Sequence, residues 1–246
     1  MRFLLTSAGV TNGSIRAALT DLLGKPIEES TAICIPTASY GFPGGPGGAW
    51  RTLRAFESLG WREFGVLELT TLTTAPESYW LPAFVGADCV IVGGGNAGYL
   101  SYWMHATGMA ERLTGLLWDK PSTVYLGAGA GSMIVTRGLH RGQEDEQPTS
   151  ATEHAESRAI APTDAVSDRA LELLDLVVRP HLNTWSDQGA IYERTATSGS
   201  VLDVPLYAID DASAVVVRDG VVRVVSEGEW AVFAPQGQEE HAALST

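Results

Sequence analysis

The chain has 246 residues, of which 45% are hydrophobic and 18% are charged. This size and composition are typical of one globular α/β domain and exclude a disordered chain. Because 16 basic residues face 29 acidic ones, the formal charge at pH 7 is −13. Nucleic acids and anionic membrane surfaces require basic patches, so we expect neither as a partner.

The sequence also predicts the cellular compartment of the protein. No apolar run approaches the ~20 residues of a membrane span, and the first residues lack the core and cleavage site of a signal peptide. Cys34 and Cys89 lie in apolar runs, which predicts two buried free thiols in a cytoplasmic protein. No histidine has a metal-ligand spacing with another histidine or a cysteine, so we expect neither metal nor cofactor.

Apolar runs alternate with helical periodicity over the first part of the chain. Because the predicted strands are uniformly apolar and helices follow them, we expect an α/β fold with a mainly parallel sheet and helices on both faces, as in flavodoxin. Ligands bind such sheets at the carboxyl ends of the strands. The predicted strands are 2–6, 31–36, 64–69, 88–92 and 122–126, and the predicted helices are 13–23, 49–59, 97–105, 109–118 and 132–135.

Glycine and proline dominate 41–48, which predicts a loop there. The polar stretch 139–168 is expected to be a long loop with one helix near 151–158. The C-terminal part then becomes rich in short β-runs, and Asp219-Gly220 predicts a hairpin turn between two of them. We expect a single α/β domain over 1–235 that ends in this hairpin-rich segment, followed by a polar tail over 236–246. The predicted late strands are 206–210, 213–218, 221–226 and 230–233.

A glycine-rich turn follows the predicted strand that ends at Val92. Gly93, Gly94, Gly95 and Asn96 would let main-chain N–H groups face an anionic ligand. A plain strand-to-helix turn is the alternative interpretation. The spacing does not match a dinucleotide-binding motif.

A second such turn, 127–131, reads Gly-Ala-Gly-Ala-Gly and has the strand–turn–helix arrangement of a nucleophile elbow. The central residue of an elbow carries the attacking atom, but here it is Gly129, which has no side chain. Ser132 lies one helical turn later. Its expected direction is away from the elbow, so it is the weaker candidate nucleophile.

His181 ends an apolar run, at a position suited to a general base, although a lone histidine is more often a packed or surface residue. The acidic residues Glu144, Asp145 and Glu146 are either a solvated loop or the source of a carboxylate that orients this histidine.

In their order and spacing, these motifs resemble the peptidase E family of aspartyl dipeptidases, which includes cyanophycinase. The resemblance also rests on Val178-Arg-Pro-His-Leu182 and on Pro205-Leu-Tyr-Ala-Ile-Asp-Asp211, and it covers nearly the whole chain. It implies a fold like that of class I glutamine amidotransferase domains. It also implies cleavage of the peptide bond after an N-terminal aspartate by a Ser-His-Asp/Glu triad.

The resemblance places the family's serine at Gly129 and its histidine base at His181. It places the acidic partner at Glu144, with Asp145 and Glu146 close behind. The implied oxyanion hole consists of N–H groups of the Gly93–Gly95 turn and of Ala130.

Three interpretations stay open. The protein is a non-hydrolytic relative that binds a small acidic peptide or amino-acid-like ligand; or it is an enzyme in which His181 activates water or Ser132 attacks; or it is a dipeptidase inactivated by engineering. A glutamine amidotransferase would need a cysteine at position 129. The terminal hairpin is compatible with a homodimer, which the sequence does not decide.

Overall fold

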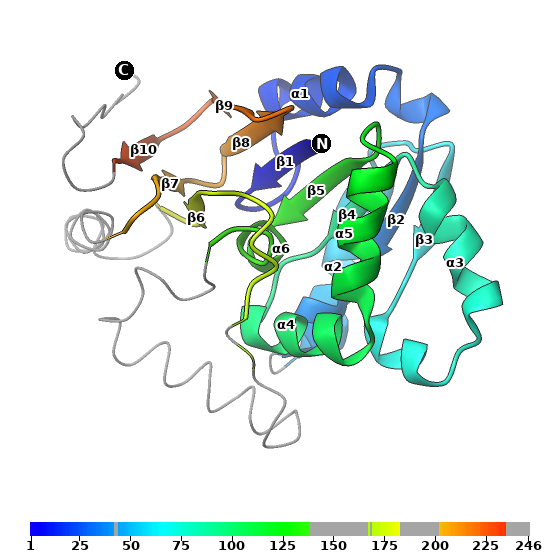
Figure 1. Cartoon of the computed structure of the whole chain (residues 1–246). Helices are drawn as coiled ribbons and strands as arrows, with labels where there is room; N and C mark the ends of the chain where they lie inside the picture. The colour runs from blue at the N-terminus through cyan, green and yellow to red at the C-terminus, as the bar shows by residue number, and fades with distance from the viewer. Residues whose placement is uncertain (42–43, 138–166, 168, 183–201, 235–246) are drawn as a thin grey trace.

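The computed structural model describes residues 1–41, 44–137, 167, 169–182 and 202–234. At its centre is a seven-stranded sheet in the order β3-β2-β4-β5-β1-β8-β9 (Figure 1). β1 to β5 are parallel, and β8 and β9 add to the sheet in antiparallel fashion next to β1. The strands are β1 (Arg2–Thr6), β2 (Thr31–Ile35), β3 (Glu63–Val66), β4 (Cys89–Val92), β5 (Val124–Ala128), β8 (Ser213–Arg218) and β9 (Val221–Ser226).

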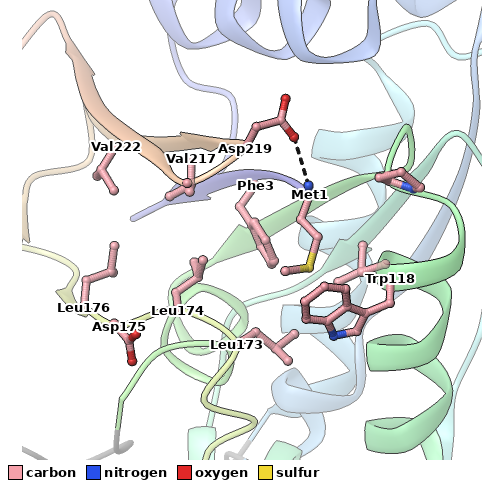
Figure 2. Close-up of a pocket in the computed structure, with 13 residues that line it drawn as sticks. Met1, Phe3, Trp118, Leu173, Leu174, Asp175, Leu176, Val217, Asp219 and Val222 are labelled. Carbon is pink, nitrogen blue, oxygen red and sulfur yellow. Dashed lines mark hydrogen bonds and ion pairs between the residues drawn. The ribbon is translucent and has the colours of Figure 1, made fainter.

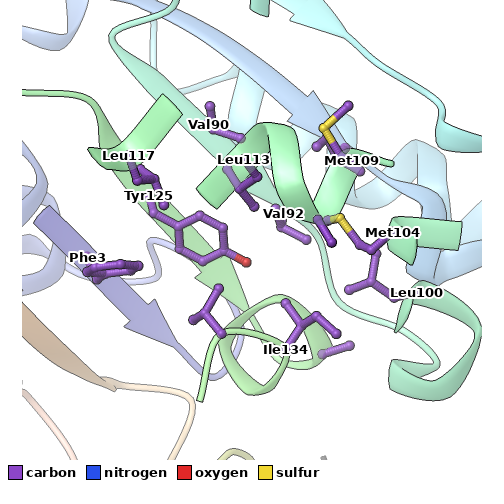
Figure 3. Close-up of a cluster of buried hydrophobic side chains, with 14 of the residues drawn as sticks. Phe3, Val90, Val92, Leu100, Met104, Met109, Leu113, Leu117, Tyr125 and Ile134 are labelled. Atoms are coloured by element: carbon purple, nitrogen blue, oxygen red, sulfur yellow. The ribbon is translucent and has the colours of Figure 1, made fainter. Parts of the chain in front are cut away.

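Helices cover both faces of this sheet, because its uniformly apolar strands must bury side chains on each side. Leu4 of β1 belongs to a buried cluster with residues of α1 and α2, whereas Phe3 and Leu5 belong to a second cluster with residues of α3, α4 and α5. Figure 3 shows part of this second cluster, with Phe3, Met104 of α4 and Leu113 of α5. The expected α/β class is therefore confirmed. The helices are α1 (Gly13–Leu23), α2 (Gly45–Glu57), α3 (Glu77–Gly86), α4 (Ala97–Ala106), α5 (Met109–Asp119) and α6 (Ala130–Met133), with 3₁₀ turns η1 (Ile27–Glu29), η2 (Thr37–Gly41) and η3 (Leu69–Thr73).

A smaller sheet of β6 (Val177–Arg179), β7 (Leu206–Ile209) and β10 (Trp230–Phe233) has the order β10-β7-β6. Val178 and Ile209 join the same core as Phe3. β1 and β5 point toward β6 and β7 (Figure 1). The residues that follow β1, β5, β6 and β7 are thereby brought together.

The structure corrects two sequence predictions. Gly45–Gly48 is not a loop but the first turn of α2, because a proline is accepted in the first helical turn and Gly44 supplies the left-handed N-cap at φ 77°. The helix α3 was not predicted. The stretches 138–166 and 235–246 lie outside the described residues, and with them the expected helix near 151–158 and the polar tail.

Among the described residues, no helix has the length and apolar character needed to cross a membrane. The Asp219-Gly220 hairpin is present between β8 and β9, with positive φ at both residues as such a turn requires.

Candidate functional site

The turn after β5 is sharply bent at Gly129. Its φ of 50° and ψ of −113° belong to a region that side-chain-bearing residues rarely adopt. The Gly129 N–H donates to the carbonyl oxygen of Thr6 at 3.0 Å, which ties the turn to the end of β1. Helix α6 begins at the next residue. The chain therefore reverses within one residue at the carboxyl end of the sheet.

The three glycines of this turn are required for different reasons. A Cβ at Gly127 would lie 2.6 Å from the carbonyl oxygen of Gly131, and a Cβ at Gly131 would overlap the carbonyl oxygen of Val92. By contrast, a Cβ at Gly129 would have ordinary van der Waals contacts, with Ser7 O at 3.5 Å and His181 Nε2 at 3.7 Å. Only position 129 of the three has room for a side chain, and that side chain would face the histidine.

His181 follows β6 in a left-handed backbone conformation, with φ 64°. Its Nδ1 lies 2.7 Å from Oδ1 of Asp211, which follows β7. The imidazole thus has Asp211 at one ring nitrogen and the Gly129 turn at the other. The structure brings together the two sequence-predicted residues Gly129 and His181.

The carboxylate beside His181 comes from Asp211, which the sequence analysis did not single out as a site residue. Asp211 belongs to the 205–211 motif and follows a predicted strand, so the rule that ligands bind at strand ends was the available signal. Glu144, Asp145 and Glu146 lie outside the described residues.

Ser7 was also missed. It follows β1, is 2% exposed, and its hydroxyl contacts both members of the His181–Asp211 pair. The same strand-end rule would have indicated it, since Thr6 ends the first predicted strand.

The Gly93–Asn96 turn lies against the Gly129 turn, because a Cβ at Gly129 would be 3.6 Å from Gly94 Cα. The N–H of Gly93 donates to Ile35 O at 2.9 Å and is not available to a ligand. The N–H groups of Gly94, Gly95 and Ala130 donate to no group in the part of the chain that the structure describes.

Neighbouring side chains hold this turn in place. Ser39 Oγ donates to the carbonyl oxygen of Gly94 at 2.9 Å. The side chain of Asn96 accepts from Tyr99 N at 2.8 Å, which makes it the N-cap of α4. The sequence-predicted binding residue Asn96 therefore has a structural role that the structure shows directly.

Ser132, the alternative nucleophile, is fully buried. Its Oγ donates to the carbonyl oxygen of Thr6 at 2.7 Å, so its single proton is used to fasten α6 to β1. Tyr125 also holds this turn in place, because its buried hydroxyl donates to Gly131 O at 2.6 Å. Burial raises the pKa of Tyr125 well above its ordinary value, so this donor keeps its proton.

A pocket of about 600 Å³ lies at the opposite end of β1, near Met1 and Trp118 (Figure 2). Its walls are mostly apolar, and its polar members, Asp175 and Asp219, are both ion-paired. This pocket is separate from the site at Ser7. Among the described residues no group of histidine, cysteine and carboxylate side chains is suited to a metal ion.

Hydrolases with a catalytic triad also place a sharp strand-to-helix turn opposite a histidine–carboxylate pair. Comparison with family models identifies the family of this chain. The model of peptidase family S51 matches residues 3–225, and the chain therefore belongs to this family. The expected membership in the peptidase E family is confirmed.

Two solved structures have the same fold. A protein assigned as a peptidase E, from Listeria monocytogenes EGD-e, is 20% identical with a TM-score of 0.65, over 92% of this chain and 98% of that one. A peptidase from an acI-B1 Actinobacterium is 17% identical with a TM-score of 0.67, over 99% of this chain and 94% of that one. The search of curated proteins gave no match.

Proposed function

We propose that this protein is a peptidase E-family member that has lost the serine nucleophile and binds a small acidic peptide-like or amino-acid-like ligand. The ligand's carbonyl group would lie between His181 and the N–H groups of Gly94 and Ala130. The observation that carries the proposal is the room at Gly129. The flanking glycines are enforced by main-chain contacts, whereas a side chain at position 129 would fit and face His181 Nε2 at 3.7 Å from its Cβ.

In this proposal Asp211, His181 and position 129 form an incomplete triad. Asp211 would hold the imidazole and His181 would act as the base, but no hydroxyl is present to attack. In a comparable serine hydrolase, removal of the nucleophile lowers kcat on the order of 10⁶-fold. Hydrogen-bond donors that remain can still give roughly 10³–10⁴ over the reaction in water.

The polar groups around the Cβ position of Gly129 favour one alternative in which the protein is still an enzyme. A water molecule at this position would have the Ser7 carbonyl oxygen and His181 Nε2 as polar neighbours, the two groups within 3.7 Å of the Cβ position. His181 would then activate water directly. Attack by Ser132 has less support, because its hydroxyl is buried and donates to Thr6.

The deciding experiment is the replacement Gly129→Ser, assayed on Asp-Xaa dipeptides beside the parent and Gly129→Ala. A serine hydroxyl one bond beyond the Cβ would lie within hydrogen-bond reach of Nε2, about 2.7–3.2 Å. We expect the serine variant to hydrolyse the dipeptides at least about a thousandfold faster than the parent, and the alanine variant to gain nothing.

The controls separate the interpretations. His181→Ala in the serine variant should abolish the gain. Hydrolysis by the parent at ordinary enzymatic rates would overturn the proposal, and a weak parental activity that His181→Ala removes would support water activation instead. A natural glycine and an engineered one predict the same gain.

Binding is tested separately, by calorimetry of the parent with the same dipeptides. We expect saturable binding without hydrolysis. If the serine variant hydrolyses the dipeptides but the parent does not bind them, the assignment of the ligand class is wrong while the assignment of the site stands.

A further inference from the structure

Ser7 connects parts of the site that are far apart in the sequence. It follows the first strand of the chain, yet its hydroxyl contacts His181 and Asp211, which lie 174 and 204 positions later. It is only 2% exposed. A buried hydroxyl needs hydrogen-bond partners, and the positions of these partners determine which atoms carry protons.

The three contacts use the full capacity of a hydroxyl group. Ser7 Oγ donates its only proton to Asp211 Oδ1 at 2.6 Å and accepts from the His181 main-chain N–H at 2.8 Å. A second lone pair faces His181 Nδ1 at 3.1 Å. Since a serine hydroxyl has one proton and two lone pairs, the third contact is satisfied only if Nδ1 carries a proton.

The contact with Asp211 also requires a proton on Nδ1 of His181. An ionised carboxylate only accepts hydrogen bonds, and its Oδ1 lies 2.7 Å from Nδ1. Two acceptors therefore converge on one ring nitrogen. In the neutral imidazole the lone pair must then be on Nε2, the nitrogen that faces the Gly129 turn.

The main-chain contact has a separate consequence. His181 has φ 64°, a strained conformation for a residue with a side chain, and such a conformation persists only where its surroundings enforce it. The hydrogen bond from its N–H to Ser7 Oγ is one such constraint, and the bond from Leu182 N to Ile209 O at 3.1 Å is another.

We propose that Ser7 is a positioning residue that, together with Asp211, fixes His181 as the Nδ1–H tautomer and in its left-handed backbone conformation. Ser7 is not itself a nucleophile, because it is buried, it faces Nδ1, and its hydroxyl donates its proton in the hydrogen bond to Asp211. The role as a positioning residue rests on the proposed function only where it concerns hydrolysis. The tautomer is a property of the protein without any ligand.

The first test is long-range ¹H–¹⁵N NMR of the histidine rings near pH 8.5, where an ordinary imidazole is neutral. His181→Gln assigns the signals. We expect a protonated Nδ1 and an unprotonated Nε2 in the parent, and a mixture of tautomers in Ser7→Ala. Ser30→Ala is the matched control, since Ser30 is equally buried and donates to Pro26 O at 2.9 Å. It should leave the His181 signals unchanged.

An Nε2–H tautomer in the parent overturns the proposal, and this measurement needs no variant. Unchanged signals in a folded Ser7→Ala protein also overturn it. Should the alanine variant fail to fold, Ser7→Cys fills a similar volume with a much weaker hydrogen-bonding group and is expected to give the same mixture.

The second test uses the hydrolytic variant Gly129→Ser. Adding Ser7→Ala should lower kcat by about 10–100-fold, the range for removing an outer partner of a functional histidine, with KM changed far less. Ser7→Thr, which keeps the hydroxyl, should retain more of kcat than Ser7→Ala. Equal kcat values with and without Ser7 would contradict the positioning role. If Gly129→Ser is inactive, the proposed function fails, whereas the tautomer is still decided by NMR.

Discussion

At the scale of single residues, the Gly129 turn shows two distinct reasons for a glycine. Gly131 is fixed by contact, since a Cβ there would overlap Val92 O. Gly129 is fixed only by its backbone angle, since a Cβ there meets nothing closer than 3.5 Å. A serine at this position would carry backbone strain that glycine avoids. Replacing it with glycine therefore removes the attacking atom and relieves strain in one step.

We predict that Gly129→Ala and Gly131→Ala destabilise the protein to different degrees. The first should lower the free energy of unfolding by about 1–2 kcal/mol, because a residue with a side chain is strained in this sparsely populated positive-φ conformation. The second should lower it by about 3 kcal/mol or more, because main chain must move. Urea unfolding of the two variants measures this, and an equal or larger loss at position 129 would contradict the steric assignment.

The site was only partly predictable from these residues. Gly129 and His181 could be paired through the family resemblance. The strand-end rule marks Asp210 and Asp211 alike and does not choose between them. Asp210 has a structural role in the turn, because its carboxylate accepts from Ser213 Oγ and Glu229 N. Which carboxylate faces a distant imidazole depends on the packing of β7 against β6, and no local pattern encodes this.

At the scale of elements, one carboxylate fastens the amino ends of two neighbouring strands. Asp88, which precedes β4, accepts from the main-chain N of Thr31 in β2 at 2.8 Å and from Lys25 Nζ at 2.9 Å. Partial burial acts to raise the pKa of Asp88, but the hydrogen bonds from Lys25 and Thr31 outweigh it, so the pKa lies below the ordinary value.

This lowered pKa predicts a pH-dependent effect of Asp88→Asn. A carboxylate whose pKa is depressed by folding stabilises the native state above its unfolded pKa of about 4, and this stabilisation is lost as the pH falls through the folded pKa. We expect the variant to be about 1–2 kcal/mol less stable at pH 7 and the difference to shrink in acid. Urea unfolding between neutral and acidic pH checks this, and a gap that stays constant with pH would contradict it.

Elements whose pattern matched their environment were predicted well. Strands β1, β2 and β4 contain continuous apolar runs, and α1 has an apolar stripe, so local sequence and burial agree. Helix α3 was missed because Pro82 lies inside it and its apolar residues form no stripe. The start of α2 was missed because glycine suggests a loop, although here Gly44 and the proline of the first turn form a helix beginning.

At the scale of the whole molecule, the reactivity of the two cysteines depends on whether the central sheet stays closed. Cys34 of β2 and Cys89 of β4 are free and fully buried, as the sequence predicts. Burial raises the pKa of Cys34 to about 12, and burial together with the charges of Cys34 and Asp88 raises the pKa of Cys89 well above its ordinary value. Thiolates react and thiols do not, so both groups should be inert in the native state.

We predict that an aromatic disulfide reagent at about pH 8 labels neither cysteine of the native protein and labels both in urea. Labelling in the absence of denaturant should be as slow as opening of the central sheet. Fast reaction of either thiol would show that β2 or β4 opens locally, which would contradict the continuous core on that face.

The position of β1 has a consequence for how the site is made. β1 lies between β5 and β8, so it is synthesised before both of its neighbours, and Ser7 is synthesised long before its partners at positions 181 and 211. Nascent chains emerge at about 5–20 residues per second, so the amino-terminal half has seconds to fold before these partners exist. A chain that stops before residue 202 would have β1 paired with β5 alone and would lack Asp211, so its site would be incomplete.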